Sequence, residues 1–377
     1  MLFLWNQPES LDPIIVCSSF HKEQQDALLS QLSVGFPLLK DAYLALAVTL
    51  QQLQSGVVVE QGSRANLAYI SKAVGVLRSL AGFHSPQNVA LCYTLGAVLS
   101  LAISSAVGVG IPDICRACLG GPSSSGRDPA PDENKSSWES LLILLETMDS
   151  LMWQRKPARK FPATTAHIDR HLGLCLPLLP YYHDLCQISN AILNTKHATA
   201  LNRMQGQLDD IRAAVEIWQP TQSAHLVDRF TSTEVVILLA QAKVYRLGAL
   251  LLSHRIRHSL GQRDAEATAW SKELIFELDL ASRVTKQTPR FVTLPFIIAA
   301  VEVQGDAQRV KTLQHVDDFV DSYALFMKQA IKTFLLRVWH ERDTKRINSW
   351  FESVHKPCPV LNYMDETIFD PRQAIAS

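Results

Sequence analysis

Three aspartates near the C-terminal end of the chain come closest to a catalytic pattern. They are Asp317, Asp318 and Asp321, in the sequence DDFVD. Carboxylates one helical turn apart can share a hard divalent cation such as Mg²⁺ through their oxygen atoms, and the cation can in turn hold a diphosphate. The same aspartates also fit the solvated face of an amphipathic helix, opposite the apolar residues Phe319 and Val320.

The spacing of these aspartates matches the aspartate-rich motif with which class I terpene synthases hold magnesium and diphosphate. Those enzymes carry the motif early in the chain, whereas here it lies near the end, and no Asn/Asp-rich partner motif follows it. We therefore favour a solvated acidic face. A helical, terpene-synthase-like enzyme that uses Asp317, Asp318 and Asp321 to hold magnesium and diphosphate is the alternative hypothesis.

Two further pairs have the residue types of metal ligands. Cys115 and Cys118 form a C-x-x-C sequence, but a structural zinc needs four ligands and no second pair lies at finger spacing. His167 and His171 lie four residues apart, without the glutamate of an H-E-x-x-H motif. We therefore predict ordinary thiols, surface histidines, and neither a metal nor a cofactor.

A short basic cluster consists of Arg155, Lys156, Arg159 and Lys160. Clusters of this kind can act as nuclear import signals. Four cations in six residues around a proline also fit an ordinary surface loop. Both interpretations stay open at this point.

Two L-x-x-L-L sequences, at residues 141–145 and 247–251, match a coactivator-docking pattern. In a chain this rich in leucine such matches mainly reflect composition, so we predict that both pack in the core. The sequence contains no phosphate-binding loop, no dinucleotide-binding glycine motif and no nucleophile elbow. The sequence therefore predicts a protein that is not an enzyme.

The composition is that of a folded protein without an overall charge. Hydrophobic residues make up 47% of the 377 and charged residues 19%, which excludes disorder over most of the length. Because 36 basic residues balance 36 acidic ones, direct contact with nucleic acid is not expected. The seven scattered cysteines fit the reduced thiols of a cytosolic or nuclear protein.

The chain starts without the cationic and apolar pattern of a secretory signal. Residues 89–111 are uncharged and long enough to cross a bilayer. They also contain several serines and glycines and have no basic residues at either end. We interpret this segment as a buried helix rather than a membrane anchor.

Helical periodicity predicts the elements that must position these side chains. The clearest helices are expected at about residues 231–258, 265–284 and 316–338, and a proline at position 37 should start a new helix. Alternating strand patterns are absent from the sequence. An all-α fold is therefore predicted, as one multi-helix array around a continuous apolar core.

We expect residues 1–377 to form a single domain. Within it, residues 119–137 are rich in Gly, Pro, Ser and charge, which predicts a flexible insertion. The tail at about residues 356–377 is expected to be less ordered.

Over most of its length the chain resembles the regulatory domain of fungal zinc-cluster transcription factors, most specifically in its last third. A weaker likeness extends through residues 20–48 and 69–80. The residues that carry the resemblance best are Tyr245, Arg246, Leu250, Leu251, Leu252, His254, Arg255, Pro295, Ala299, Ala300, Glu302, Arg309, Val338 and Trp339.

This resemblance implies a transcriptional regulator in the nucleus that controls a metabolic pathway, often one of secondary metabolism. It implies protein partners, either the transcription machinery or a DNA-binding factor, and a homo-oligomer and a small-molecule effector are compatible with it. The family's zinc module, with a C-x2-C-x6-C run, is not found in the sequence. We therefore expect these residues to act without a zinc cluster of their own, as a stand-alone regulator or as part of a longer factor.

Overall fold

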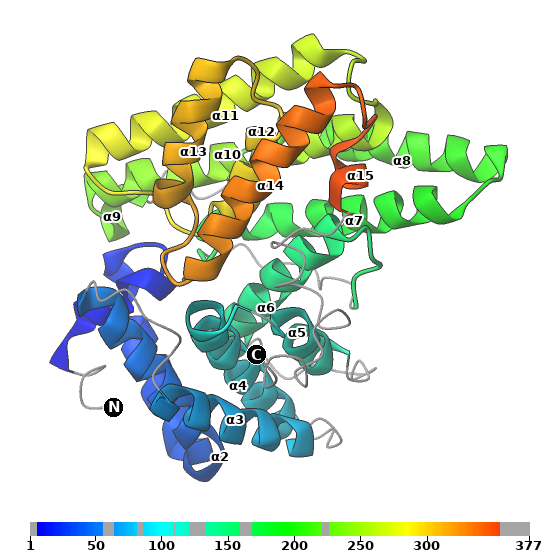
Figure 1. Cartoon of the computed structure of the whole chain (residues 1–377). Helices are drawn as coiled ribbons and strands as arrows, with labels where there is room; N and C mark the ends of the chain where they lie inside the picture. Colours follow the sequence, from blue (N-terminus) through cyan, green and yellow to red (C-terminus); the bar gives the residue numbers. More distant parts are fainter. Residues whose placement is uncertain are drawn as a thin grey trace. The chain divides into compact units, whose positions relative to one another are not determined.

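The computed structural model describes residues 6–55, 64–80, 86–108, 110–120, 133–158, 168–220 and 226–354. Throughout these ranges the regular secondary structure is helical, apart from an isolated β-bridge between Asp169 and Gly173 (Figure 1). The predicted all-α fold class is therefore confirmed.

The chain divides into two compact units. The first holds the described residues up to Glu146 together with Ser322–Met327, and the second holds Thr147–Asp321 and the described residues from Lys328 onward. That residues 1–377 fold and act as one domain stays a prediction. Residues 121–132, in the centre of the predicted insertion, and the predicted tail lie outside the described residues.

The first unit is built from long helices. Its elements are η1 (Pro8–Ile14), η2 (Ser18–Phe20), α2 (His21–Ser55), α3 (Arg64–Leu80), α4 (Pro86–Ala106), α5 (Ile111–Leu119) and the first part of α6 (Glu133–Met152). Helix α2 is kinked at Gly35, which has non-helical backbone angles, two residues before Pro37. The kink agrees with the prediction that Pro37 starts a new helix.

Helix α4 contains most of the uncharged segment at residues 89–111. Two helices of the described chain are long and apolar enough to cross a membrane, at residues 88–106 and Ser232–Arg257. Of the most apolar stretch of each helix, however, 89% in the first and 72% in the second is buried inside the protein. The burial of residues 88–106 supports the interpretation of this segment as a buried helix. Helix α4 ends at Ala106, earlier than the apolar run, because Gly108 takes a left-handed conformation that closes the helix.

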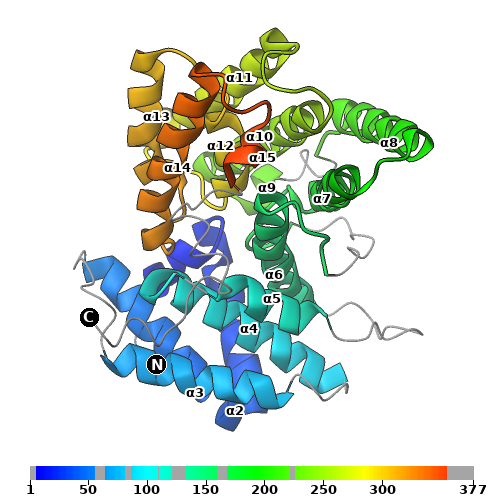
Figure 2. The same ribbon diagram turned by 45° about the vertical axis from the view of Figure 1, so that its right-hand side comes forward.

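The second unit surrounds one long helix. Its elements are η3 (Leu176–Leu178), α7 (Leu179–Asn194), α8 (Ala198–Ile217), α9 (Leu226–Arg229), α10 (Ser232–Arg257), α11 (Asp264–Thr285), α12 (Thr293–Ala300), α13 (Asp306–Phe319), α14 (Leu325–Asp343, from Lys328 in this unit) and α15 (Trp350–Val354). Helix α10 contacts α7, α8, α9, α11 and α12. Figure 2 shows these helices from a second side.

Local signals in the sequence explain where α10 starts and ends. Thr231 and Glu234 form a reciprocal capping box at its N-terminus, and cationic residues lie in its last turn. A short connection then leads into α11. The helices predicted at about 231–258 and 265–284 are therefore confirmed.

The continuous helix predicted at 316–338 is wrong. Helix α13 ends at Phe319, and Val320 takes an extended conformation before α14 starts at Leu325. The periodic apolar residues on both sides of the break are buried, apart from the half-buried Met327, so the pattern identified most core positions correctly. It missed the break because Asp321 makes its hydrogen bonds with a distant segment of the chain, which local periodicity cannot register.

Candidate functional site around helix α12

Helix α12 is a short apolar helix in the middle of the second unit. Its sequence, TLPFIIAA, has eight residues and all of them are buried. A helix of this length is not stable alone in water, so packing and bonds at its ends must fix its position. The residues that supply those bonds include most of the polar residues that carry the family resemblance.

The N-terminal end of α12 is held by Asp321 and Tyr245. The carboxylate of Asp321 accepts hydrogen bonds from the backbone N–H of Phe291 and from the hydroxyl of Thr293, both at 2.7 Å. The hydroxyl of Tyr245, on α10, donates to the carbonyl oxygen of Phe291 at 2.6 Å. Phe291 has a positive φ of 55°, which is costly for a residue with a side chain, and these bonds stabilise it.

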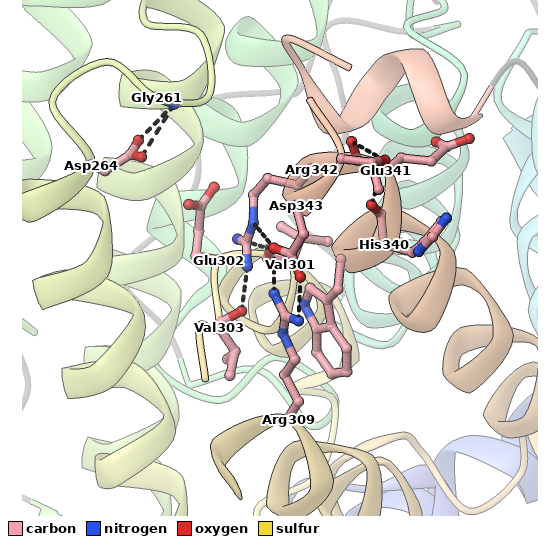
Figure 3. Close-up of polar contacts among 12 residues, drawn as sticks. Gly261, Asp264, Val301, Glu302, Val303, Arg309, His340, Glu341, Arg342 and Asp343 are labelled. Atoms are coloured by element: carbon pink, nitrogen blue, oxygen red, sulfur yellow. Dashed lines mark hydrogen bonds and ion pairs between the residues drawn. The ribbon is translucent and has the colours of Figure 1, made fainter. Parts of the chain in front are cut away.

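The C-terminal end of α12 is held by two side chains of α14. The indole Nε1 of Trp339 donates to the carbonyl oxygen of Ala300 at 3.0 Å. The guanidinium of Arg342 donates to the carbonyl oxygens of Val301 and Val303, at 2.9 and 2.6 Å (Figure 3). The carbonyl oxygens of Val301 and Val303 follow the last turn of α12, where helix carbonyls need partners from outside the helix. That of Ala300 also accepts a hydrogen bond from the N–H of Val303 at 3.2 Å.

A buried ion pair fixes the segment directly after α12. Nε and Nη2 of Arg255 donate to the two carboxylate oxygens of Glu302 at 2.8 and 2.7 Å, and the side chains are 3% and 1% exposed. Nη2 of Arg255 also donates to Asp264 at 2.7 Å, and Nη1 donates to the carbonyl oxygens of Ser259 and Gln262. Arg255 therefore ties the end of α10 and the start of α11 to the segment after α12.

The charges around Arg255 keep it protonated. Burial alone would lower the pKa of its guanidinium, but the hydrogen bonds and negative charges of Glu302 and Asp264 outweigh burial and raise that pKa above its ordinary value. We call Tyr245, Asp321, Trp339, Arg342 and the Arg255–Glu302 pair the α12 clamp.

Arg309 supports the clamp from α13. Its guanidinium makes two hydrogen bonds with the carboxylate of Asp343, at 2.6 and 2.8 Å (Figure 3). It also lies 5.4 Å from the ring centre of Trp339. The hydrogen bond from Arg309 is the main reason that the pKa of Asp343 is lowered. A bidentate arginine that also stacks on an aromatic ring holds α13 and α14 in one register.

Helices α7 and α10 approach closely next to α12. The hydroxyl of Tyr182, on α7, donates to the carbonyl oxygen of Tyr245 at 2.7 Å. One turn further along α10 is Gly248, where an added Cβ would lie 2.5 Å from that hydroxyl and 3.0 Å from Cβ of Pro295. Glycine is therefore required at this position by space, although glycine is a poor helix former.

Substituting Gly248 by alanine is expected to lower the free energy of unfolding by about 1–2 kcal/mol, because the new methyl group must displace Tyr182 or α12. The matched control is Gly206→Ala in α8, where nothing lies within 4 Å of the added Cβ. That change should instead raise stability by up to about 1 kcal/mol. Urea denaturation of both variants gives the comparison, and equal effects would contradict the packing described for Gly248.

The three aspartates of the aspartate-rich motif have separate partners. Asp317 pairs with Lys332 at 2.7 Å, Asp318 lies 3.4 Å from His315, and Asp321 belongs to the α12 clamp. Among the described residues, no group of three or more His, Cys, Asp or Glu side chains is arranged to hold a metal ion. The geometry therefore gives the terpene-synthase alternative no metal-binding cluster.

The described residues of the cysteine and histidine pairs are buried in the protein. Cys115 and Cys118 are buried free thiols, and Sγ of Cys118 donates to the carbonyl oxygen of Cys92 at 3.4 Å. Burial raises the pKa of the Cys118 thiol well above its usual range, which keeps it neutral. The surface prediction for His171 is wrong, because its ring is fully buried against Phe291.

The position of His171 has a local cause. It lies in a turn closed by the bridge between Asp169 and Gly173, and its backbone N–H donates to the carboxylate of Asp169 at 2.8 Å. The turn directs the imidazole inward, which a helical pattern would not predict. His167 lies outside the described residues.

The two short interaction motifs differ in exposure. The leucines of both L-x-x-L-L sequences are buried, so the prediction of core packing is confirmed. In the basic cluster, Arg155 is half-buried with its guanidinium 5.1 Å from the ring centre of Trp153, and Lys156 is exposed. Arg159 and Lys160 lie outside the described residues.

Sequence reasoning missed three residues of this site. These are Asp264, which pairs with Arg255, Arg342, which donates to the end of α12, and Asp343, which pairs with Arg309. For Asp264, a signal was present, because an acidic residue after Gly261 is typical of a helix start. For the other two, the partners come from different helices and no local pattern marks them.

Comparison with known protein families gives a match that covers the candidate site. Residues 115–367 match the family model of the fungal specific transcription factor domain. No curated protein and no solved structure matches the chain. The matched range covers the whole of the second unit and part of the first, and it includes all residues of the α12 clamp.

Proposed function

The chain belongs to the family of the fungal specific transcription factor domain, which makes it a transcriptional regulator, and we propose that it acts through other proteins. The match over residues 115–367 is the observation that carries the proposal. The balanced charge of the chain supports a division of labour in which a DNA-binding factor, or another segment, contacts the DNA. The proposed target is a metabolic or secondary-metabolite biosynthesis pathway.

The regulatory step that we propose is a change in the packing of the second unit. The α12 clamp joins α10 and α14 to the two ends of α12 by charged or buried hydrogen bonds. Arg255 of the clamp also binds Asp264 at the start of α11, and Arg309 ties α13 to α14. A packed arrangement of this kind is changed in discrete steps rather than continuously. A partner protein or a small effector that prefers a second arrangement would therefore shift the population of the regulator.

A tethering experiment tests the regulatory role. Residues 1–377 are fused to an unrelated DNA-binding module whose sites lie upstream of a reporter gene in a fungal host. We expect reporter output to change severalfold relative to the module alone, and the Arg255→Met fusion to lose this effect because the clamp is broken. Output equal to that of the module alone, from a fusion that is present at normal levels, would refute the proposal.

We also propose that the chain works in the nucleus and that Arg155, Lys156, Arg159 and Lys160 form its import signal. Replacing all four by alanine in a fluorescent fusion should move the protein from the nucleus to the cytoplasm. The control replaces four exposed cations elsewhere, Lys22, Lys40, Arg203 and Arg257. If the first variant stays in the nucleus, the cluster is a surface loop and not an import signal.

A further inference from the structure

Helix α11 carries an apolar stripe on its exposed side. Phe276, Leu280 and Val284 follow one another at four-residue spacing, with 62%, 42% and 62% of each residue exposed. Scattered single apolar residues are normal on a surface, but three in line on one helix form a continuous patch. Within the described part of the chain these three side chains are exposed to solvent.

The neighbouring helix widens the patch. Helices α10 and α11 are packed against each other and joined by a short connection, so they run antiparallel. Nζ of Lys243 on α10 lies 2.8 Å from the carboxylate of Glu277 on α11, which fixes their register. One turn away from this pair, the register places the exposed side chain of Leu239 beside Leu280.

Opposite charges flank the stripe. Glu273 lies three residues before Phe276, and Arg283 lies three residues after Leu280, with side chains 49% and 68% exposed. The order along α11 is therefore an acidic residue, two apolar residues and a basic residue. Lys243 is shared by Glu273 and Glu277, at 3.2 and 2.8 Å, and Asp279 is shared by Arg283 and Lys311, at 2.8 and 3.0 Å. One negative charge therefore remains unbalanced at the Glu273 end of the stripe and one positive charge at the Arg283 end.

We propose that this surface binds a second copy of the same chain, with the two α11 helices antiparallel across a two-fold axis. A two-fold interface must be self-complementary, and the order of residues on α11 has this property. Phe276 of each copy lies against Leu280 and Leu239 of the other, and Glu273 of each copy lies opposite Arg283 of the other. A parallel arrangement would place Glu273 against Glu273 and is disfavoured by repulsion.

This dimer does not depend on the regulatory role, because it is defined by mass in solution rather than by reporter output. Sedimentation velocity of the full chain over a range of concentrations should show a monomer and a dimer in exchange. Phe276→Glu should weaken the dimer by about 30-fold or more, as expected for a central aromatic residue of an interface. The matched control is Leu336→Glu, at an exposed apolar position in the middle of α14, which should leave the dimer unchanged.

A charge exchange tests the two-fold geometry. Glu273→Arg and Arg283→Glu should each weaken self-association, because each places like charges opposite each other twice in the dimer. Mixing the two variants should restore association, since both contacts of the mixed dimer then join opposite charges. Far-UV circular dichroism confirms that each variant is folded.

Three outcomes would overturn the proposal. The first is a wild-type chain that stays monomeric at all concentrations, which would leave the surface to a different protein. The second is a dimer that Phe276→Glu does not weaken. The third is a failure of the mixed variants to associate better than either variant alone.

Discussion

Replacing Arg255 by methionine is expected to lower the free energy of unfolding by about 3–5 kcal/mol, the range found when one partner of a buried ion pair is removed. The methionine fills much of the volume but leaves the carboxylate of Glu302, which is 1% exposed, without its counter-ion. The carbonyl oxygens of Ser259 and Gln262 lose a donor at the same time. The cost is therefore due to an uncompensated buried charge rather than to a cavity.

Urea denaturation with two further variants separates these causes. Arg257→Met, two residues along α10, removes a surface pair with Asp209 and should cost about 1 kcal/mol or less. The double variant Arg255→Met/Glu302→Met removes both charges of the buried pair and should recover much of the loss. A loss for Arg255→Met no larger than that for Arg257→Met would show that the buried pair is not important for stability.

The sequence predicted the helices of the second unit better than it predicted their bonds. Helix α10 has a capping box at one end and cations at the other, and these signals lie within a few residues of what they control. Arg255 and Glu302 are 47 residues apart, and their pairing depends on how α10 and α12 pack. Periodicity identifies which residues are buried, but it does not identify the partner of a buried charge.

The family resemblance selected several clamp residues without giving their roles. Tyr245, Arg255, Glu302 and Trp339 were named from the pattern alone, and the structure brings all four to the ends of α12. Asp321 shows the opposite case. It was grouped with Asp317 and Asp318 by spacing, yet its oxygens bind the segment before α12. The spacing of the three aspartates would place them on one helical face, but α13 ends at Phe319, before Asp321.

Lowering the pH from 7 to about 4.5 is expected to destabilise the protein through His254. This residue is buried at the end of α10, and its pKa is lowered from 6.5 to about 4. Burial is the main cause, and the positive charges of Arg255 and His258 add to it. Glu266, whose carboxylate lies 3.6 Å from Nδ1 of His254, opposes the shift without cancelling it.

The other groups around the imidazole come from α11 and α8. Trp270 packs edge-on against the His254 ring at 5.5 Å, which contributes to its burial. Arg212, on α8, lies over the Trp270 ring and also 3.7 Å from Glu266. Because Glu266 is thus shared between an arginine and the histidine, it does not provide His254 with a full counter-charge.

The direction of the pH effect follows from proton linkage. Between pH 6.5 and about 4 the unfolded chain binds a proton on His254 and the folded chain does not, so stability falls as the pH falls through this window and levels off below it. At about 1.4 kcal/mol per pKa unit, the complete effect is roughly 3 kcal/mol. Urea denaturation at a series of pH values should show this loss.

Variants that remove a histidine isolate this contribution from the titration of other groups. His254→Leu should lose less stability than the wild type between pH 7 and pH 4.5, by about 2 kcal/mol, because part of the complete effect lies outside this interval. His340→Leu, at an exposed position on α14, should keep the pH dependence of the wild type. Parallel pH profiles for His254→Leu and the wild type would mean that the folded chain protonates His254 as easily as the unfolded chain does, in contradiction to its burial beside Arg255.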